Sequence, residues 1–486
     1  MTNEALPPQP QTLAEALVII EALWAENARL RESIGRLEQQ VQRVVAQVSQ
    51  NSTNSSRPPS TDPPQRPPPP PRQPTGRRRG AQPGHPAHQR ALLPPEHVDH
   101  TLDHYPPVCQ HCQLPLVPDP AQTVGEPVRH QVVELPPVRA EVTDHYLHRL
   151  RCPHCQGQTR ASLPPAVPAG AFGPRLQAIV ALLSSRYRLS RREVTAVGAD
   201  LLGVDLCLGS VDDLCQATSQ ALADPVAALQ AAVHQAPIVN ADETEWRQAG
   251  QRRWLWVAVS AVATVFTVAR SRGSQVIKGL LGPGFAGILG SDRWSAYTWV
   301  DPARRQVCWA HLKRDFQALV DWGGAATPLG KAALALLDVL FDAWHQARDD
   351  PAAAARLAET VAPTQAAFRM LLEVGQRSPS RKAAGLCTSL LHLWPALWTF
   401  VTVPGVEPTN NAAERAVRPA VLWRKGSFGS QSDAGAVFVA RLLSVAATCR
   451  QQDRSLLDYL TAVCTASQQG HPIPSLLPEP APAQAA

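Results

Sequence analysis

Residues 238–242, IVNAD, and residues 286–292, AGILGSD, decide the fold of this chain. Each stretch is a short apolar run that leads to an aspartate, which predicts two buried strands ending at Asp242 and Asp292. Two more β-branched runs lie between them, at 253–261 and 264–269, so we expect a meander of strands with a short helix near 274–281 before the last one. Carboxylates at the ends of neighbouring strands can form an oxygen site suited to Mg²⁺. Taken singly, an aspartate after a strand more often caps a turn.

A third carboxylate is suggested by residues 410–418, NNAAERAVR. Positions three or four apart share one face of a helix, so this segment would present two amides, Glu414 and a guanidinium together. The competing interpretation is a capped surface helix with an ordinary Glu to Arg pair, worth about 0.2–0.5 kcal/mol. The motif alone does not separate the two interpretations.

Two cysteine pairs, CQHC at 109–112 and CPHC at 152–155, each place two thiols within reach of one ion. Tetrahedral Zn²⁺ with four thiolates supplies folding energy that a short proline-rich segment cannot obtain from a core. Disulfides or chance pairing are the alternatives, and the histidine inside each pair is an alternative ligand. We predict a zinc-ribbon-like unit with one structural zinc, whose ligands are Cys109, Cys112, Cys152 and Cys155.

The net charge of +6 is concentrated in one stretch, because residues 57–90 carry seven Arg and one Asp. The same stretch contains twelve prolines, which predicts an extended, disordered tether. Such charge favours a polyanion as partner, and we expect Arg77, Arg78 and Arg79 to contact phosphates. A linker whose charge only keeps it solvated is the alternative.

Residues 13–48 repeat apolar positions every seven residues, a spacing typical of a coiled coil. β-Branched residues at the first seam position with Leu at the second favour a parallel dimer, and Asn27 at one first position would fix its register. A single amphipathic helix packed on its own domain is the alternative. We expect a homodimer or a higher assembly.

Three helices are expected between residues 173 and 222, and the second opens with a capping-box pattern at Ser190. The third, expected from Ser210, carries two aspartates at its start, where a major-groove reader normally presents Arg, Asn or Gln. We therefore expect a packing element, while the arginines at 186–192 are candidates for phosphate contacts.

Composition excludes two classes of protein. No fully apolar run approaches the ~20 residues that cross a bilayer, and the first residues lack the basic and apolar blocks of an export signal. The two cysteine pairs and six scattered cysteines fit a reducing compartment better than a disulfide framework. The expected location is the cytoplasm, with no membrane partner.

Several motifs of the chain occur in the order found in one protein family. They are NSTNSSRPPSTD at 51–62, RGAQPGH at 79–85, the two cysteine pairs, DET at 242–244, SDRWSAY at 291–297, CWAHLKRDF at 308–316 and NNAAER at 410–415 with Arg418-Pro419. Over nearly its whole length the chain resembles the insertion sequence 66 family of bacterial transposases. It departs from the family pattern at 204–211 and at Gly426-Ser-Phe, which concern only DNA reading.

The resemblance implies an RNase H-like fold with a triad of Asp242, Asp292 and Glu414. It also implies a mainly helical insertion between the second and third acids, which fits their separation of 122 positions. Two Mg²⁺ or Mn²⁺ ions are expected, with Asp242 bridging both, as in two-metal phosphoryl transfer. Cys308 and His311 are either a buried cysteine with a satisfied histidine or a second metal site. Residues expected to bind phosphates or orient Glu414 are Asn410, Asn411, Arg415 and Arg418.

The expected fold class is multidomain α/β. Its expected segments are a coiled-coil dimerisation helix at 13–50, a disordered basic tether at 51–95, a zinc-binding domain at 96–165, a helical DNA-binding or packing region at 170–230, an RNase H-like core at 231–325 that resumes with C-terminal helices at 406–466, a helical insertion at 326–405, and a flexible tail at 467–486.

The expected function is that of a DNA transposase of a bacterial insertion sequence, associated with the nucleoid. It would bind element ends, cleave DNA strands and transfer them to target DNA, with small proteins of the same element as candidate accessory partners. Two other functions fit parts of the sequence. One is a non-catalytic, zinc-containing dimeric DNA-binding regulator, and the other is an RNase H-like nuclease that cuts without joining.

Overall fold

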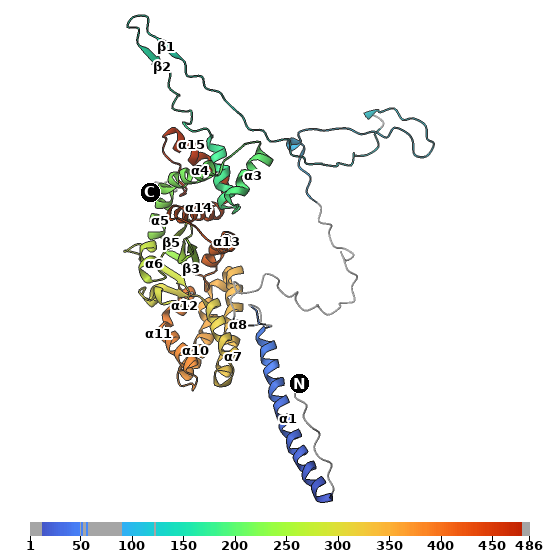
Figure 1. Cartoon of the computed structure of the whole chain (residues 1–486), viewed down its shortest axis with the longest axis vertical. Coiled ribbons are helices and arrows are strands. Elements are labelled where there is room, and N and C mark those ends of the chain that lie inside the picture. Colours follow the sequence, from blue (N-terminus) through green and yellow to red (C-terminus); the bar gives the residue numbers. More distant parts are fainter. Residues whose placement is uncertain (1–11, 49, 52–54, 57–89, 121–122, 479–486) are drawn as a thin grey trace.

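The computed structural model describes residues 12–48, 50–51, 55–56, 90–120 and 123–478. Within them, α1 (Leu13–Val48) is a single helix of 36 residues that lies apart from the packed body of the chain (Figure 1). Its seam residues Ile20, Leu23, Ile34 and Leu37 are exposed, so the alternative of packing on its own domain is not observed. Self-association through this seam stays a prediction.

Extended chain with short turns makes up the described residues 90–120 and 123–165. The elements there are η2 (Pro95–His97), β1 (Arg149–Arg151) and β2 (Gln158–Arg160). β1 and β2 pair as an antiparallel hairpin, and a separate bridge joins Val108 to Pro115. The hairpin and the turn closed by this bridge lie far apart along the extended segment (Figure 1). Most of the predicted tether, with Arg77, Arg78 and Arg79, is outside the described residues.

Four helices follow, and they are α2 (Pro174–Ser185), α3 (Arg191–Leu202), α4 (Leu208–Ala221) and α5 (Ala223–His234). The capping box at Ser190 is confirmed, since its side chain accepts from the N–H of Glu193 and the Glu193 side chain accepts in return. The third helix begins at Leu208 rather than Ser210, because Cys207 acts as its N-cap. Asp212 forms an ion pair with Arg191 at 3.0 Å, which ties α4 to α3.

A mixed five-stranded sheet forms the centre, in the order β5-β4-β3-β6-β7. β3, β4 and β5 pair antiparallel, and β6 and β7 continue in parallel from β3. The bounds are β3 (Ile238–Gln248), β4 (Gln251–Val259), β5 (Thr264–Ala269), α6 (Ser274–Leu281), β6 (Ile288–Ser291), η4 (Ser295–Tyr297), η5 (Pro302–Arg304) and β7 (Arg305–Val307).

The predicted end of β3 at Asp242 is wrong. The strand continues to Gln248 because it stays paired with β4 along its length, up to a tight turn. Ala249 and Gly250 make that turn with positive φ angles of 48° and 75°. Asp242 therefore lies inside a strand, whereas Asp292 directly follows β6 as predicted.

Side-chain alternation along β3 decides what each face of the sheet presents. The face with Asp242, Thr244 and Trp246 is covered by α13 (Asn411–Ser427), since the rings of Trp246 and Trp423 meet edge to face at 6.4 Å. The opposite face carries Glu243. The remaining helices of this body are α14 (Asp433–Gln451), which packs on β5, and α15 (Leu456–Gln469), which packs on α2.

Helices fill the stretch between β7 and α13 and form a second hydrophobic core around Trp309, Phe316, Phe368 and Trp398. They are α7 (Trp309–Trp322), η6 (Gly324–Ala326), α8 (Thr327–Asp349), α9 (Pro351–Ala355), α10 (Leu357–Gly375), α11 (Arg381–His392) and α12 (Trp394–Thr402). Among the described residues, the stretch Gly324–Asp349 is apolar and long enough to span a membrane, as is the bent pair α11 and α12 if taken together. α8 packs against α7 and α10, as a core helix does.

The predicted flexible tail is wrong for residues 467–478, which are held against the body of the chain. α15 runs to Gln469, and Leu476 is buried at 1% exposure. Two hydrogen bonds hold the segment down, from Gln452 to the carbonyl of Leu476 at 2.9 Å and from the Tyr459 hydroxyl to Pro474 at 3.0 Å. Residues 479–486 lie outside the described part of the chain.

Candidate active site

Asp242 lies in β3, and Asp292 directly follows the neighbouring parallel strand β6. Asn240 of β3 pairs with Gly290 of β6, and continuing this register by two residues brings the two aspartates to the same level. Each carboxylate accepts one nearby backbone N–H, from Glu243 to Asp242 at 2.9 Å and from Trp294 to Asp292 at 2.8 Å. The remaining oxygen lone pairs are available to a ligand.

The pKa of Asp242 is raised well above its ordinary value, first by burial and then by the carboxylates of Glu243, Asp292 and Glu414. Burial without a counter-charge disfavours the ionised form. A divalent cation would remove this penalty, and oxygen donors are the ligands that Mg²⁺ prefers. The residues present therefore fit a hard cation.

Glu414 lies in the first turn of α13, and Asn410 fixes where that helix begins. The Asn410 side chain, 1% exposed, donates to the carbonyl of Ala241 at 2.7 Å. Its backbone N–H donates to Cys308 Sγ at 3.2 Å. Asn410 thus ties α13 both to β3 beside Asp242 and to the start of α7. Contact between Asn410 and DNA stays a prediction.

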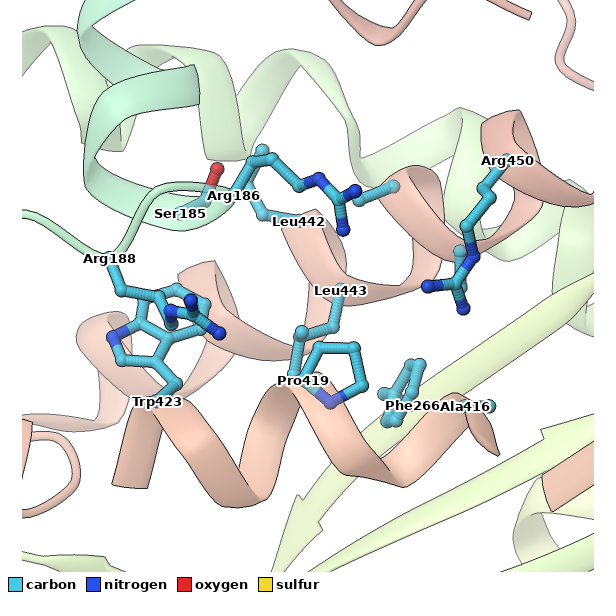
Figure 2. A pocket seen from close by; sticks show the side chains of 12 residues that line it. Ser185, Arg186, Arg188, Phe266, Ala416, Pro419, Trp423, Leu442, Leu443 and Arg450 are labelled. Atoms are coloured by element: carbon cyan, nitrogen blue, oxygen red, sulfur yellow. The ribbon is translucent and has the colours of Figure 1, made fainter. Parts of the chain in front are cut away.

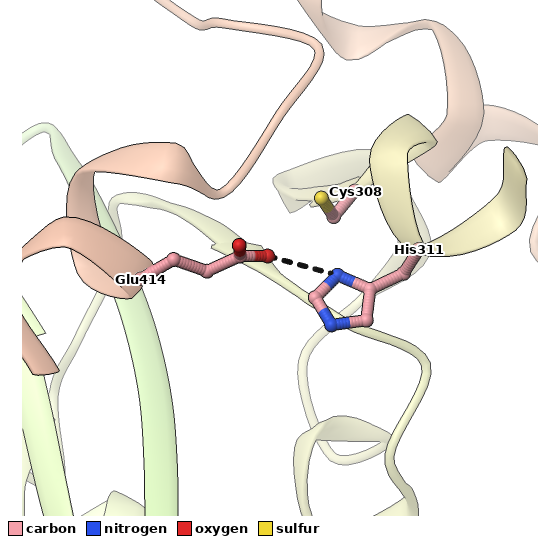
Figure 3. A group of neighbouring side chains, drawn as sticks. All are labelled: Cys308, His311 and Glu414. Atoms are coloured by element: carbon pink, nitrogen blue, oxygen red, sulfur yellow. Dashed lines mark ion pairs between the residues drawn. The ribbon is translucent and has the colours of Figure 1, made fainter. Parts of the chain in front are cut away.

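The carboxylate of Glu414 faces α7, where Oε1 lies 3.3 Å from His311 Nδ1 and 3.9 Å from Arg314 Nη2. Cys308, His311 and Glu414 form a compact group (Figure 3). Their ligand atoms lie within 4.8 Å of one another, the one such group of three or more His, Cys, Asp or Glu among the described residues. The structure therefore brings Glu414 to Cys308 and His311, and it does not bring all three predicted carboxylates within shared ligand distance.

Burial also shifts the groups around Glu414. The pKa of the Cys308 thiol is raised to about 11, mainly by burial. The pKa of His311 is lowered by burial and by the nearby charge of Arg314, against the opposing effect of Glu414. Both groups are thus favoured in their neutral forms.

Glu243 is a further buried acid, but it belongs to a different cluster on the opposite face of the sheet. Its carboxylate pairs with Arg272 at 2.8 Å and accepts the Tyr297 hydroxyl at 2.5 Å. Arg272 in turn lies over the rings of Trp254 and Trp294, at 4.7 Å and 4.0 Å from their centres. Because these contacts engage its charge, Glu243 is not a candidate metal ligand.

Arg305 is a positioning residue that the sequence did not indicate. It is fully buried and donates to the carbonyl of Asp292 at 2.6 Å and to Ser291 Oγ at 3.2 Å. Burial lowers its pKa to about 10. Arg305 fixes the backbone at Asp292. Its position depends on the pairing of β6 with β7, which no local sequence pattern indicates.

Three exposed arginines surround a groove beside α13. Arg186 and Arg188 follow α2, and Arg450 lies in the last turn of α14; Figure 2 shows all three around the same hollow. Within the described part of the chain, none of the three has an ion pair or a side-chain hydrogen bond. The floor of the groove is apolar and includes Phe266, Pro419, Trp423 and Leu443. On the exposed side of α13 lie Arg415 and Arg418.

The two cysteine pairs adopt the same local turn. Gln113 and Gln156, each directly after a pair, have φ of 60°, and each donates its N–H to the carbonyl of the first cysteine at 2.9 Å. Backbone N–H groups within each turn lower the pKa of Cys109 and of Cys152, which favours the thiolates that zinc needs. The structure places the pairs in separate turns, so the four thiols are not assembled into one group.

Three segments of the chain match known protein families. Residues 169–437 match the family described as "Transposase IS66 family", and residues 106–156 match the "zinc-finger binding domain of transposase IS66". Residues 5–91 match a "Family of unknown function (DUF6444)".

Two curated relatives come from Sinorhizobium fredii (strain NBRC 101917 / NGR234). "Uncharacterized protein y4qI" is 28% identical over 256 residues, which are 47% of this chain and 46% of that protein. "Uncharacterized protein y4hP" is 25% identical over 368 residues, which are 68% of this chain and 66% of that protein. The match spans about half of the first relative and just under two thirds of the second. Since the transposase family covers more than half of the chain and its zinc-finger domain precedes it, the chain belongs to the IS66 family of transposases.

Proposed function

We propose that this transposase cleaves and joins DNA strands at a divalent-metal site formed by Asp242, Asp292 and Glu414. The observation that supports the site best is the parallel register of β3 and β6, which, continued by two residues, brings Asp242 level with Asp292 just after β6. The raised pKa of Asp242 supports it further, because its causes are first the burial of this carboxyl and then the neighbouring carboxylates. The strand order of the sheet agrees with the RNase H-like core that the family resemblance implies.

The chain's own residues would do three things in the reaction. Asp242 and Asp292 would hold the cation, with Arg305 fixing Asp292 through its carbonyl at 2.6 Å. Glu414 would complete the ligand set once its carboxylate turns from His311 toward Asp242. Bound Mg²⁺ or Mn²⁺ would supply Lewis-acid stabilisation of the phosphate and a lowered pKa for the attacking water or 3′ hydroxyl.

DNA would approach along the positive surface beside α13. Arg186, Arg188 and Arg450 have no protein partner among the described residues, and guanidinium groups pair well with phosphates. The apolar floor of the groove, with Trp423 and Pro419, suits the deoxyribose face of a strand. The tether arginines and the zinc-binding domain would contact DNA outside this surface. The four thiolates of that domain would bind one zinc once its two turns meet.

The test is an assay of cleavage and joining with labelled DNA from the ends of the element that carries the gene. With Mg²⁺ and target DNA, the proposal expects both nicked element ends and products joined to the target. Binding without nicking would indicate a DNA-binding regulator, and nicking without joined products would indicate a nuclease. Either result would contradict the proposed function.

A further inference from the structure

The cluster of Cys308, His311 and Glu414 has the composition of a metal site that differs from the carboxylate site. Cys308 precedes α7 and is 1% exposed, His311 lies one turn further, and Glu414 enters from α13 (Figure 3). One ligand atom from each lies within 4.8 Å of the other two. Two helices from different parts of the chain thus converge on one point.

Two of these three ligand atoms are buried without a hydrogen-bond partner. His311 Nδ1 and Glu414 Oε1 are both buried and neither has a hydrogen bond, although they lie only 3.3 Å apart. A buried polar atom without a partner costs about 1–3 kcal/mol. A cation between the two atoms would satisfy both at once.

Burial favours the thiol of Cys308 until a cation binds, but one backbone donor already lies where it would stabilise the thiolate. Cys308 Sγ accepts the backbone N–H of Asn410 at 3.2 Å, and hydrogen bonds to the charged form of a group stabilise that form. Asn410 is itself fixed by its bond to Ala241. The backbone N–H of Asn410 is therefore held in place by the fold and does not depend on a bound ion.

We propose that Cys308 Sγ, His311 Nδ1 and Glu414 Oε1 bind a borderline divalent cation of the Zn²⁺ class. A ligand set of sulfur, nitrogen and oxygen suits Zn²⁺, whereas Mg²⁺ selects oxygen ligands alone. Three protein ligands leave a fourth position of a tetrahedral ion for water. On binding, the thiol proton of Cys308 passes to solvent, and no group changes its oxidation state.

This site would regulate the proposed reaction, and that consequence rests on the proposed role of Glu414. An ion that holds Oε1 against α7 keeps this carboxylate from joining Asp242 and Asp292. Zinc would then act as an inhibitor that competes with the active arrangement of Glu414. Low zinc would release the carboxylate for catalysis.

Binding is tested by equilibrium dialysis of the full chain against Zn²⁺, with bound metal counted per chain. Cys308→Ser should bind one zinc fewer than the wild type. The matched control is Cys387→Ser, because Cys387 is fully buried and lies on α11 outside the cluster; it should bind as much as the wild type. Should Cys308→Ser fail to fold, His311→Gln provides the same comparison. Equal zinc in the wild type and a folded cluster variant overturns the proposal.

Regulation is tested by adding Zn²⁺ to the Mg²⁺-dependent nicking assay. The zinc concentration that inhibits the wild type and Cys387→Ser should be at least tenfold lower than the concentration that inhibits the residual activity of Cys308→Ser. Equal sensitivity would mean that zinc acts elsewhere, and it would overturn the inhibitory role. Absence of nicking by the wild type would count against the proposed function instead, and the dialysis result would still decide the binding site.

Discussion

Replacing Asp242 by Asn should raise the melting temperature of the Mg²⁺-free protein. Burial and three neighbouring carboxylates raise the pKa of Asp242 in the folded state, whereas an unfolded Asp titrates near ~3.9. The folded chain then binds more protons than the unfolded chain between these two pKa values. Stability falls as pH rises through that interval, and the full penalty applies above it. A neutral amide removes the penalty.

The size of the effect follows from the strand spacing. Neighbouring strands lie ~4.8 Å apart, and two charges at ~5 Å with an effective dielectric constant of ~20 repel by about 3 kcal/mol. Because Asp242 is half-buried rather than fully buried, solvent screening reduces this to about 1–2 kcal/mol. For a domain of this size each kcal/mol shifts the melting temperature by ~2–4 °C. An increase of several degrees is therefore expected.

The assay is thermal unfolding at neutral and at mildly acidic pH, with and without Mg²⁺. The control is Glu245→Gln on the same strand, which should leave the melting temperature close to that of the wild type. Glu245 pairs with Arg247 and Arg252 at the surface, and exposed pairs of this kind contribute only about 0–1 kcal/mol. Mg²⁺ at 100 times its Kd should stabilise the wild type by ~2.7 kcal/mol and Asp242→Asn much less. A lower melting temperature for Asp242→Asn than for the wild type without Mg²⁺ would refute the reasoning.

Three further predictions concern other parts of the chain. Cys152→Ser should remove one bound zinc per chain and weaken the fold of residues 96–165, measured by metal analysis; unchanged zinc would argue against a four-cysteine site. Arg186→Gln and Arg188→Gln should each lower the slope of log K for duplex DNA against log salt by ~0.9, while Arg348→Gln, whose guanidinium already pairs with Asp349, leaves it unchanged. A peptide of residues 13–48 should sediment as a dimer, and Asn27→Ile should stabilise it while loosening its register; a monomer would contradict the coiled coil.

The apolar runs of the sequence were enough to predict most of the sheet. β5 and α6 occur at the predicted residues, and Asp292 follows its strand, because each run is short, apolar and bounded by turn residues. The second half of β3 was missed, since DETEWRQ at 242–248 is mostly polar. It forms a strand because pairing with β4 satisfies its backbone. β7 has only three residues, too few for a periodic signal.

The sequence proposes the residue types of the candidate site but not their contacts. Asp242, Asp292 and Glu414 were predicted from the two apolar runs, the helix motif and the family resemblance, and their joint role stays a prediction. The approach of Glu414 to His311 joins positions more than a hundred residues apart, which no local pattern encodes. Arg305 is missed for the same reason, since an arginine is ordinarily a surface residue and its burial depends on β6 and β7 pairing.

The central claim, that three carboxylates carry the chemistry, is tested most directly by nicking of element-end DNA with Mg²⁺ or Mn²⁺. The single variants are Asp242→Asn, Asp292→Asn and Glu414→Gln, and the control is Glu245→Gln. Glu245 lies on the same strand, but it pairs with Arg247 and Arg252 away from the site.

The account predicts that all three variants still bind DNA, while their nicking rates fall by orders of magnitude and Glu245→Gln nicks at close to the wild-type rate. Substantial nicking by any one of the three would contradict the role given to that carboxylate, and nicking by all three would remove the site.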